Sequence, residues 1–312
     1  MLRVLIVTAM YPHPGHEGAG AFVMQQVEGL RRRGHDVEVL HFRGYLSKLE
    51  YLKAAWKVWL RTWQTRFDVV HAHYGVTAVA TIFRWKVPLV MTLHGSDALV
   101  GKIQPTISRF LSRIASATIV VSKTIAAKIP GDIIPCGVDL GCFEPKDRLA
   151  ARQRLGLDPK RRYLLFPFDP SRQLKRFDLA SMAVERLRAE GIDAELLAIS
   201  MVPNAEMPWY YSAADAMVLC SNSEGSPTAV KEALACNIPV VTTDVGDVRE
   251  IINGIEGVPL CPQTVDGLVE GFRRVLNPPA GFVFNSRDAM QRYSQDRILD
   301  SIVAVYGRVA RV

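Results

Sequence analysis

Several features that would assign this chain to a particular class are missing from its sequence. No apolar run approaches the roughly 18 residues of a membrane-spanning helix, and the opening segment LRVLIVTAM has the pattern of a buried strand instead of a signal peptide. The five cysteines are odd in number and contain no C-x-x-C pair, which disfavours a disulfide framework and a zinc knuckle. Internal repeats and low-complexity segments are also missing. We therefore expect a globular, cytoplasmic protein with free thiols.

The sequence does contain enough apolar residues for two cores, and its charge is uneven. The 312 residues are 49% hydrophobic and carry a net charge of +7, and a chain of this length suits two domains. Residues 1–146 hold 18 Lys and Arg against 10 Asp and Glu, whereas residues 147–312 hold 20 against 21. The positive first half favours an anionic partner, such as a membrane surface, a phosphorylated acceptor or nucleic acid, with a solvated basic surface as the alternative.

The first 42 residues have the pattern of a βαβ unit. An apolar strand is followed by a loop with Gly15, Gly18 and Gly20, then by an amphipathic helix and a second strand from Val37 to Phe42. The loop is not a G-x-G-x-x-G motif, and no acidic residue follows the second strand to bind a ribose. These departures disfavour a nicotinamide dinucleotide site.

A loop leading into a helix in the second half predicts a phosphate-binding site. The small residues at 224–227 precede a helical pattern from Thr228 to Cys236. The first turn of a helix has unpaired backbone N–H groups and the positive end of the helix dipole, both of which attract phosphate. Glu224 and Glu232 lie on either side of this helix start. Carboxylates are poor phosphate ligands, so we expect them to accept hydrogen bonds from sugar or ribose hydroxyls.

Polar residues follow three predicted strands, where ligands bind in parallel α/β sheets. One strand ends in the H-x-H pair His71 and His73, and another, at 87–93, ends at His94-Gly95-Ser96-Asp97. We expect the two histidines of the pair to point in opposite directions, and because no third ligand is evident we predict no metal site. After the strand at 163–168, Arg172 and Lys175 precede a helix and could neutralise a diphosphate.

The segment 46–67 predicts a strongly amphipathic helix. Its apolar side chains fall within one arc of roughly 100° at helical spacing: Leu49, Leu52, Trp56, Trp59, Leu60, Trp63 and Phe67. The basic residues Lys53, Lys57 and Arg61 lie at the edges of this arc or outside it. Tryptophan beside Lys and Arg is typical of a helix that lies in a membrane interface. The alternative is a helix that packs its apolar arc on the sheet.

Several of these segments together resemble one family. The E-x7-E spacing followed by EALACNIPVV, the segments DVVHAH and TLHGSD, and the R-x-x-K-R turn resemble motifs of the retaining family 4 glycosyltransferases. The resemblance implies an α/β fold of the GT-B type, with two Rossmann-like domains facing a cleft. The expected acceptor-side domain is 1–146, with a helix at 287–312 crossing back onto it, and the expected nucleotide-sugar domain is 147–286.

Two departures from the family pattern stand beside the candidate site. Asp169-Pro170-Ser171 replaces the glycine that usually precedes the Arg of the phosphate turn. Only the seven residues 200–206 join the strand at 194–199 to the segment MPWYYSAADAMVLCS, so we expect the second domain to lack one αβ unit. Since that unit commonly helps to hold the nucleotide base, the identity of the base does not carry over.

The resemblance also implies a role for each matching residue. His94 would lie near the transferred sugar, with Asp97 and His73 on the acceptor side. Glu224 would bind the sugar hydroxyls, Glu232 the ribose, and Arg172, Lys175 and the N–H groups of Thr228 and Ala229 the departing diphosphate. The remaining donor-side positions are Gly18, Gly20, Gly225 and Ser226.

The implied reaction is a metal-independent transfer with retention of configuration and without a cofactor. The donor would be a UDP- or GDP-sugar, and the acceptor a glycan or a lipid-linked molecule in polysaccharide or glycoconjugate assembly. The helix at 46–67 would give contact with the inner face of the membrane through Trp56, Trp59 and Trp63. No nucleic-acid partner is implied.

Other readings of the sequence remain open. A phosphorylase or epimerase reaction could use the same fold, although phosphorylases need a pyridoxal-phosphate lysine in a much longer chain. The chain could also be a catalytically degenerate subunit that binds a sugar nucleotide and reaches the membrane through residues 46–67.

Overall fold

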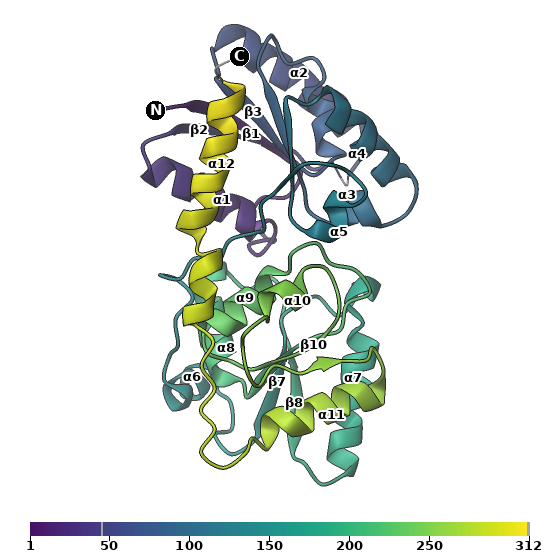
Figure 1. Ribbon diagram of the computed structural model, residues 1–312, viewed down its shortest axis with the longest axis vertical. Coiled ribbons are helices and arrows are strands. Elements are labelled where there is room, and N and C mark those ends of the chain that lie inside the picture. The colour runs from purple at the N-terminus through teal and green to yellow at the C-terminus, as the bar shows by residue number, and fades with distance from the viewer. Residues whose placement is uncertain (45, 311–312) are drawn as a thin grey trace. The chain divides into compact units, whose positions relative to one another are not determined.

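The computed structural model of the chain describes residues 1–44 and 46–310 (Figure 1). The chain divides into two compact units. The first unit contains residues 1–14, 19–137 and the segment from Gln295 onward, and the second contains residues 15–18 and 138–294. The chain therefore enters the second unit at residue 138, before the expected boundary at 146, and returns to the first at 295 instead of 287.

The first unit is built on a six-stranded parallel sheet with the order β2-β1-β3-β4-β5-β6. Its strands are β1 (Arg3–Thr8), β2 (Asp36–His41), β3 (Val69–His73), β4 (Leu89–Leu93), β5 (Ala117–Val120) and β6 (Asp132–Ile133). Side chains alternate along β1, so Val4 and Ile6 contribute to one hydrophobic cluster while Leu5 and Val7 contribute to the other. A parallel sheet that is covered on both faces explains the continuous apolar run at the start of the chain.

Helices cover both faces of this sheet. One face packs against α1 (Ala21–Arg32) and α12 (Gln295–Val309). The other is covered by α2 (Lys48–Gln64), η1 (Thr77–Thr81), α4 (Ile103–Ile114) and α5 (Lys123–Ala126), while α3 (Ser96–Leu99) directly follows β4. The expected helix at 287–312 is two elements, η4 (Asp288–Tyr293) and α12, because the extended backbone of Ser294 interrupts it. Residues 311–312 of that prediction lie outside the described residues.

The second unit contains a five-stranded parallel sheet with the order β11-β10-β9-β7-β8. Its strands are β7 (Arg162–Phe166), β8 (Ala194–Ala198), β9 (Ala216–Leu219), β10 (Val240–Thr243) and β11 (Leu260–Cys261). Its helices are α6 (Arg148–Leu155), η2 (Gln173–Lys175), α7 (Phe177–Ala189), η3 (Asn204–Glu206), α8 (Met207–Ala213), α9 (Thr228–Ala235), α10 (Val248–Ile251) and α11 (Val265–Leu276). Between β8 and α8 there is one short 3-10 turn and no further strand, as the sequence predicted for the shortened segment.

Helix α2 packs in a way that its sequence pattern did not predict. The side chains that it buries are Ala54, Val58 and Thr62. Four residues of the predicted arc face solvent: Leu49, Leu52, Trp56 (63% exposed) and Trp63 (60% exposed). Trp59 and Leu60 are half-buried, and Phe67, beyond the end of α2, is buried in the core. The alternative in which the whole apolar arc packs on the sheet is therefore wrong, because small residues give α2 its closest approach to the core.

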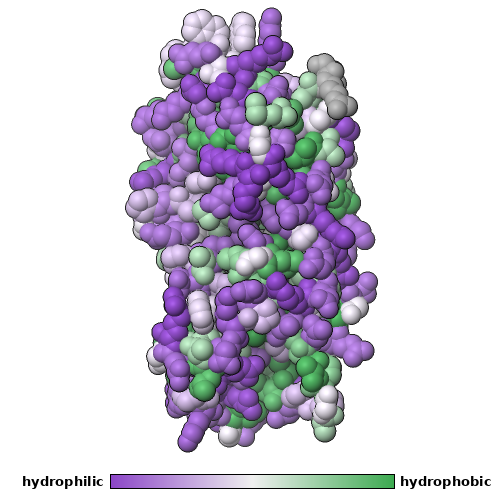
Figure 2. All heavy atoms as spheres, turned by 90° about the vertical axis from the view of Figure 1, so that its left-hand side faces the viewer, coloured by the Kyte–Doolittle hydropathy of each residue, from purple (hydrophilic) through white to green (hydrophobic). Residues whose placement is uncertain are grey.

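The side of the molecule shown in Figure 2 is mostly polar. Figure 2 looks onto the side on which α12 lies in Figure 1, and hydrophilic residues dominate this view, with hydrophobic residues gathered only in small groups. Within residues 1–44 and 46–310, no helix is both long and apolar enough to cross a membrane.

Candidate active site

The loops that follow β7, β9 and β10 meet at the carboxyl edge of the second sheet, the usual ligand-binding edge of a parallel sheet. The backbone N–H of Asn222, after β9, donates to the carbonyl oxygen of Leu174, after β7, at 2.8 Å. Gly246, after β10, has a φ of +62°, and a Cβ there would lie 2.8 Å from the carbonyl oxygen of Gly225. Glycine therefore permits the close approach of two loops that build this edge.

Lys175 and Glu224 form an ion pair at this edge. The Lys175 Nζ donates to Glu224 Oε1 at 2.6 Å, and their side chains are 10% and 13% exposed. The Nζ also lies 4.1 Å from the centre of the Phe168 ring. Burial lowers the pKa of Lys175, and the bond to Glu224 opposes this shift. The two residues that the sequence assigned to the diphosphate and the sugar are thus direct neighbours, with the exposed Arg172 close by on the same turn.

Helix α9 begins just after Glu224 and carries Glu232. Pro227 is its N-cap and makes no side-chain capping bond, so the first N–H groups of the helix have no capping side chain. The hydroxyl of Tyr211, from α8, donates to Glu232 Oε2 at 2.8 Å. Burial raises the pKa of Glu232 to about 7, while hydrogen bonds from Tyr211 and Thr228 oppose the rise. Glu232 is therefore held in a fixed position and changes its charge near neutral pH.

A buried polar network that the sequence did not indicate supports this loop. Ser226 donates from its hydroxyl to Asp247 Oδ2 at 2.6 Å, and the fully buried Lys231 donates to the Ser226 hydroxyl. Burial raises the pKa of Asp247, and Lys231, 3.9 Å away, opposes the rise. Asp247 Oδ1 has no hydrogen-bond partner among the described residues. Lys231 and Asp247 thus fix the position of Ser226 in the donor loop from its buried side.

In the first unit, His73, predicted for the acceptor side, and His94, predicted to lie near the transferred sugar, come together at the ends of β3 and β4. The His73 Nδ1 and His94 Nε2 atoms are 3.0 Å apart, and one of the two nitrogens donates to the other. His71 and His73 stack with ring centres 4.4 Å apart, so the expectation that they point in opposite directions is wrong. Residues two apart in a strand share a face, which explains the stacking. His71 is held by Thr92 and Tyr306 at 2.7 and 2.5 Å.

Asp97 organises the loop that carries His94. Its carboxylate accepts the backbone N–H groups of Gly75, His94 and Gly95 at 2.9 to 3.0 Å, and the residue is 2% exposed. The carboxylate therefore fixes the backbone of the loop that positions His94. Burial lowers the pKa of His73 to about 3 and lowers that of His94 well below its usual range. Both imidazoles are consequently neutral at pH 7, when His94 can exchange hydrogen bonds but carries no charge.

The two glycines of the first loop that are predicted for the donor side, Gly18 and Gly20, have different surroundings. Gly20 has a φ of +65° and is the N-cap of α1, and a Cβ there would lie 2.3 Å from the carbonyl oxygen of Met10. Gly18 belongs to the second unit in the division given above. Among the described residues, no group of three or more His, Cys, Asp and Glu side chains is arranged to hold a metal ion.

The residues predicted to contact a membrane lie along the outer side of α2. Trp59 stands between Trp56 and Trp63, with ring centres 4.9 and 6.0 Å away. Arg61 makes two hydrogen bonds to Glu38 of β2, at 2.5 and 2.7 Å, so its charge is already paired. Lys53 pairs with Glu50 on the exposed surface at 2.8 Å, and Lys57 is exposed.

Comparison with known proteins identifies the family. The family profile described as "Glycosyltransferase Family 4" matches residues 16–142, and that described as "Glycosyl transferases group 1" matches residues 174–297. The teichuronic acid biosynthesis glycosyltransferase TuaC of Bacillus subtilis is 27% identical over 88% of this chain and 89% of its own length. A D-inositol 3-phosphate glycosyltransferase of Frankia alni is 29% identical over 68% of this chain and 66% of its own length.

Solved structures with the same fold include two that align with almost the whole chain. Sucrose-phosphate synthase of Thermosynechococcus elongatus superimposes with a TM-score of 0.79 at 19% identity, covering 99% of both chains. Anabaena HepE in complex with UDP and glucose superimposes with a TM-score of 0.73 at 18% identity, covering 99% of this chain and 100% of its own. The two parallel α/β units thus have the GT-B fold. The chain therefore belongs to the group 1, family 4 glycosyltransferases and is an enzyme of the hexosyltransferase type.

Proposed function

We propose that this enzyme transfers a hexosyl group from a nucleotide-diphosphate sugar to a hydroxyl of a glycan or lipid-linked acceptor, with retention of configuration and without a metal ion or cofactor. The observation that carries the proposal is the ion pair of Lys175 and Glu224 beside the start of α9. A cation, a carboxylate and unpaired N–H groups match the diphosphate and the hydroxyls of such a donor.

In this proposal the charge of the departing diphosphate is met by Arg172, Lys175 and the N–H groups near Thr228 and Ala229. Such preorganised donors stabilise the charge that develops in the transition state. Glu224 accepts hydrogen bonds from hydroxyls of the transferred sugar, and Glu232 accepts those of the ribose. Tyr211 supports this role of Glu232, because its hydroxyl donates to one carboxylate oxygen and fixes the position of the carboxylate.

The proposed step breaks the bond between the anomeric carbon and the diphosphate oxygen. The acceptor oxygen forms a bond to the same face of that carbon, and the acceptor proton leaves on the diphosphate. His94 would hydrogen-bond a hydroxyl of the sugar through its neutral imidazole, and His73 would orient it through their 3.0 Å contact. A glycosyl-enzyme adduct trapped on a carboxylate would refute this course.

The relatives guide the choice of substrates. HepE was crystallised with UDP-glucose, and TuaC is named for teichuronic acid biosynthesis. We therefore propose a UDP-sugar as the first donor to test, with GDP-sugars next, and a role in the assembly of a polysaccharide or glycoconjugate.

A thermal-shift screen of UDP-, GDP- and ADP-sugars tests donor binding, because a ligand at 100 times its Kd adds about 2.7 kcal/mol of stability. Purified enzyme should then hydrolyse or transfer the sugar, also in the presence of EDTA. Glu224→Gln should abolish turnover, whereas the control Glu185→Gln, on the exposed side of α7, should not. Binding without turnover of any donor or acceptor would instead favour the degenerate binding subunit.

We further propose that the first unit rests on an anionic membrane surface. The exposed apolar residues of α2 cover the same face of the sheet as α4, where Ile103, Phe110 and Ile114 are 76%, 59% and 43% exposed. The turn after η1 adds Phe83 and Trp85. Large exposed apolar side chains on several elements of one face favour an interaction site over single, scattered surface positions.

Basic residues on these elements favour a lipid surface over an apolar protein partner. Lys57, Lys102 and Arg109 are exposed beside the apolar stripes, and each basic residue near an anionic surface adds about 1 kcal/mol of attraction. Co-sedimentation with vesicles of phosphatidylglycerol and phosphatidylcholine should detect binding that vesicles of phosphatidylcholine alone do not support. Replacing Trp56 and Trp63 by Ser should weaken it, while Trp209→Ser in the second unit should not. Unchanged binding of the double variant would disprove the proposal.

A further inference from the structure

A second cavity in the second unit lies at the opposite edge of its sheet from the candidate donor site. It is lined by residues at the amino ends of four strands. Arg162 begins β7, Asp215 precedes β9, and Pro239 and Pro259 precede β10 and β11. The cavity has a volume of about 970 Å³, which is the size of small-molecule binding sites. Because all strands are parallel, it does not share the edge that carries Glu224 and Glu232.

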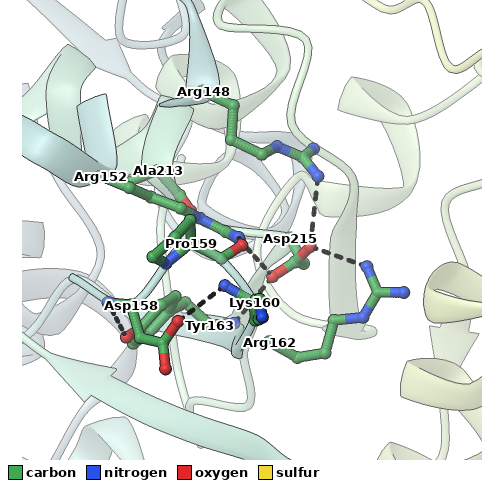
Figure 3. A network of polar contacts seen from close by, with 9 residues as sticks. All are labelled: Arg148, Arg152, Asp158, Pro159, Lys160, Arg162, Tyr163, Ala213 and Asp215. Atoms are coloured by element: carbon green, nitrogen blue, oxygen red, sulfur yellow. Dashed lines mark hydrogen bonds and ion pairs between the residues drawn. The ribbon is translucent and has the colours of Figure 1, made fainter. Parts of the chain in front are cut away.

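One buried carboxylate in this cavity gathers three guanidinium groups (Figure 3). Asp215 Oδ2 accepts from Arg152 at 2.8 Å and from the backbone N–H of Tyr163 at 2.8 Å. Asp215 Oδ1 accepts from Arg148 and from Arg162, each at 3.2 Å. The carboxylate therefore has four donors and carries one negative charge against three positive charges.

The three arginines are not equivalent. Arg152 is buried and has further partners in the carbonyl oxygens of Ala213 and Pro159, at 3.0 and 2.7 Å. The side chains of Arg148 and Arg162 are each 50% exposed and share a single acceptor oxygen at a long distance. Their charge is consequently not balanced by Asp215, which serves mainly to hold the two forks side by side at the cavity wall.

The rest of the lining is mostly apolar. Phe282 and Phe284 are partly buried, and Val258 and Leu276 contribute aliphatic surface. The other charged groups of the wall are Arg274, which pairs with Glu270 at 3.0 Å, and the exposed Glu256. The cavity thus combines one cationic end with an apolar body.

We propose that this cavity binds a phosphorylated small molecule, with the phosphoryl group held between Arg148 and Arg162. Two guanidinium groups side by side can each donate two hydrogen bonds to a phosphoryl group. Asp215 offers them only one shared oxygen, so most of their donors are available to a ligand. The apolar wall with Phe282 and Phe284 receives the body of the ligand. Asp215 stays bonded to Arg152 and to the N–H of Tyr163, so occupation of the site leaves the buried part of the network intact. The site is separate from the donor site and does not depend on the function proposed above.

Isothermal titration with inorganic pyrophosphate tests the site in a background that weakens diphosphate binding at the donor edge, Arg172→Gln. We expect saturable binding of one pyrophosphate in this background. Adding Arg162→Gln or Arg148→Gln should raise the Kd at least tenfold. Adding Arg161→Gln should leave it unchanged, since Arg161 is adjacent in the chain but pairs with Glu195 outside the cavity.

A second pair of variants, at Val283, distinguishes a loss of binding from a loss of folding. Val283 lines the cavity and is 83% exposed, so its replacement does not disturb the core. Val283→Glu should weaken pyrophosphate binding by charge repulsion, and Val283→Gln should not. If no saturable binding occurs in the Arg172→Gln background, or if the variants at Arg148, Arg162 and Val283 all bind as tightly as their controls, the proposal is refuted.

Discussion

The hydrogen bond from Tyr211 to Glu232 gives a prediction with a distinct dependence on pH. Burial keeps the pKa of Tyr211 well above its usual range, with Glu232 reinforcing the shift, so Tyr211 remains a donor at every pH of interest. Its bond at 2.8 Å favours the ionised form of Glu232. Tyr211→Phe removes that bond and should therefore raise the pKa of Glu232 further above its value of about 7.

The size of the effect follows from the type of bond. A hydrogen bond to a charged group contributes about 1.5 kcal/mol or more, which corresponds to about one pKa unit. The pKa of Glu232 would then move from about 7 to about 8. At pH 7 the ionised fraction would fall from about one half to about one tenth. If the ionised carboxylate is the form that accepts ribose hydroxyls, donor affinity should fall about fivefold at pH 7 and hardly at all at pH 9.

Calorimetric titration of the nucleotide sugar selected by the donor screen, at intervals from pH 6.5 to 9, measures this effect. Tyr210→Phe is the matched control, because Tyr210 precedes Tyr211 on α8 but it is the Tyr211 hydroxyl that donates to Glu232. The ratio of Kd values between Tyr211→Phe and wild type should shrink as the pH rises. A ratio that stays the same across the range would mean that Tyr211 acts through packing, and the reasoning would be wrong.

Two further predictions concern stability. Glu232 has a folded pKa of about 7 against an ordinary value of 4.5, so the folded state holds its proton more tightly. The tighter proton binding stabilises the folded state fully below pH 4.5, and this stabilisation is lost as the pH rises through 7. The free energy of unfolding should therefore fall by about 3 kcal/mol over this range because of Glu232. Urea unfolding curves of Glu232→Gln should lack this pH-dependent change. Gly246→Ala forces a Cβ to within 2.8 Å of the Gly225 carbonyl oxygen at positive φ. It should cost about 1–2 kcal/mol in thermal melts, and a cost near zero would show that the loop adapts.

Much of the fold could be predicted because parallel strands that are buried on both faces appear in the sequence as continuous apolar runs. The segment at 194–199 is an example, because the chain forms β8 (Ala194–Ala198) within the predicted residues. The residues at the candidate site could be named for a related reason. Ligand-binding side chains follow strand ends, so a strand prediction and a polar residue after it together locate His94 and Lys175. Glu224 is located instead by the loop that leads into helix α9.

What the sequence did not indicate depends on contacts between distant segments. Tyr211 is 21 residues from Glu232, and Ser226 is 21 residues from Asp247, with each pair joined only by the tertiary fold. A buried Lys such as Lys231 reads in the sequence as one more polar position of α9. No pattern marks which polar residues are buried with a partner, so these supporting groups appear only when the helices are placed on the sheet.

Helix α2 shows a different limit. Its periodicity correctly predicted a helix with one large apolar arc, but not which side of the helix faces the core. The buried side contains Ala54 and Val58, which count little in a pattern dominated by three tryptophans. The largest residues are then left in solvent, where burial against a lipid surface would recover their hydrophobic free energy.

The pair of Lys175 and Glu224 leads to a final prediction, because the same carboxylate that binds the sugar also opposes the diphosphate. Glu224→Gln removes a negative charge 2.6 Å from the Lys175 Nζ. A nucleoside diphosphate without a sugar should therefore bind this variant more tightly, by about threefold to tenfold, which is about 0.7–1.4 kcal/mol. The nucleotide sugar should gain less, because it loses its acceptor for the sugar hydroxyls.

Titration of wild type and Glu224→Gln with the nucleoside diphosphate and with the nucleotide sugar measures both effects. Because Glu224 raises the pKa of Lys175 against the effect of burial, the variant should lose its gain at high pH, where Lys175 gives up its proton. Lys175→Met should weaken both ligands and should abolish the gain when combined with Glu224→Gln. Equal changes in affinity for the two ligands in Glu224→Gln would mean that Glu224 does not contact the sugar, and its assignment in the proposed mechanism would have to be withdrawn.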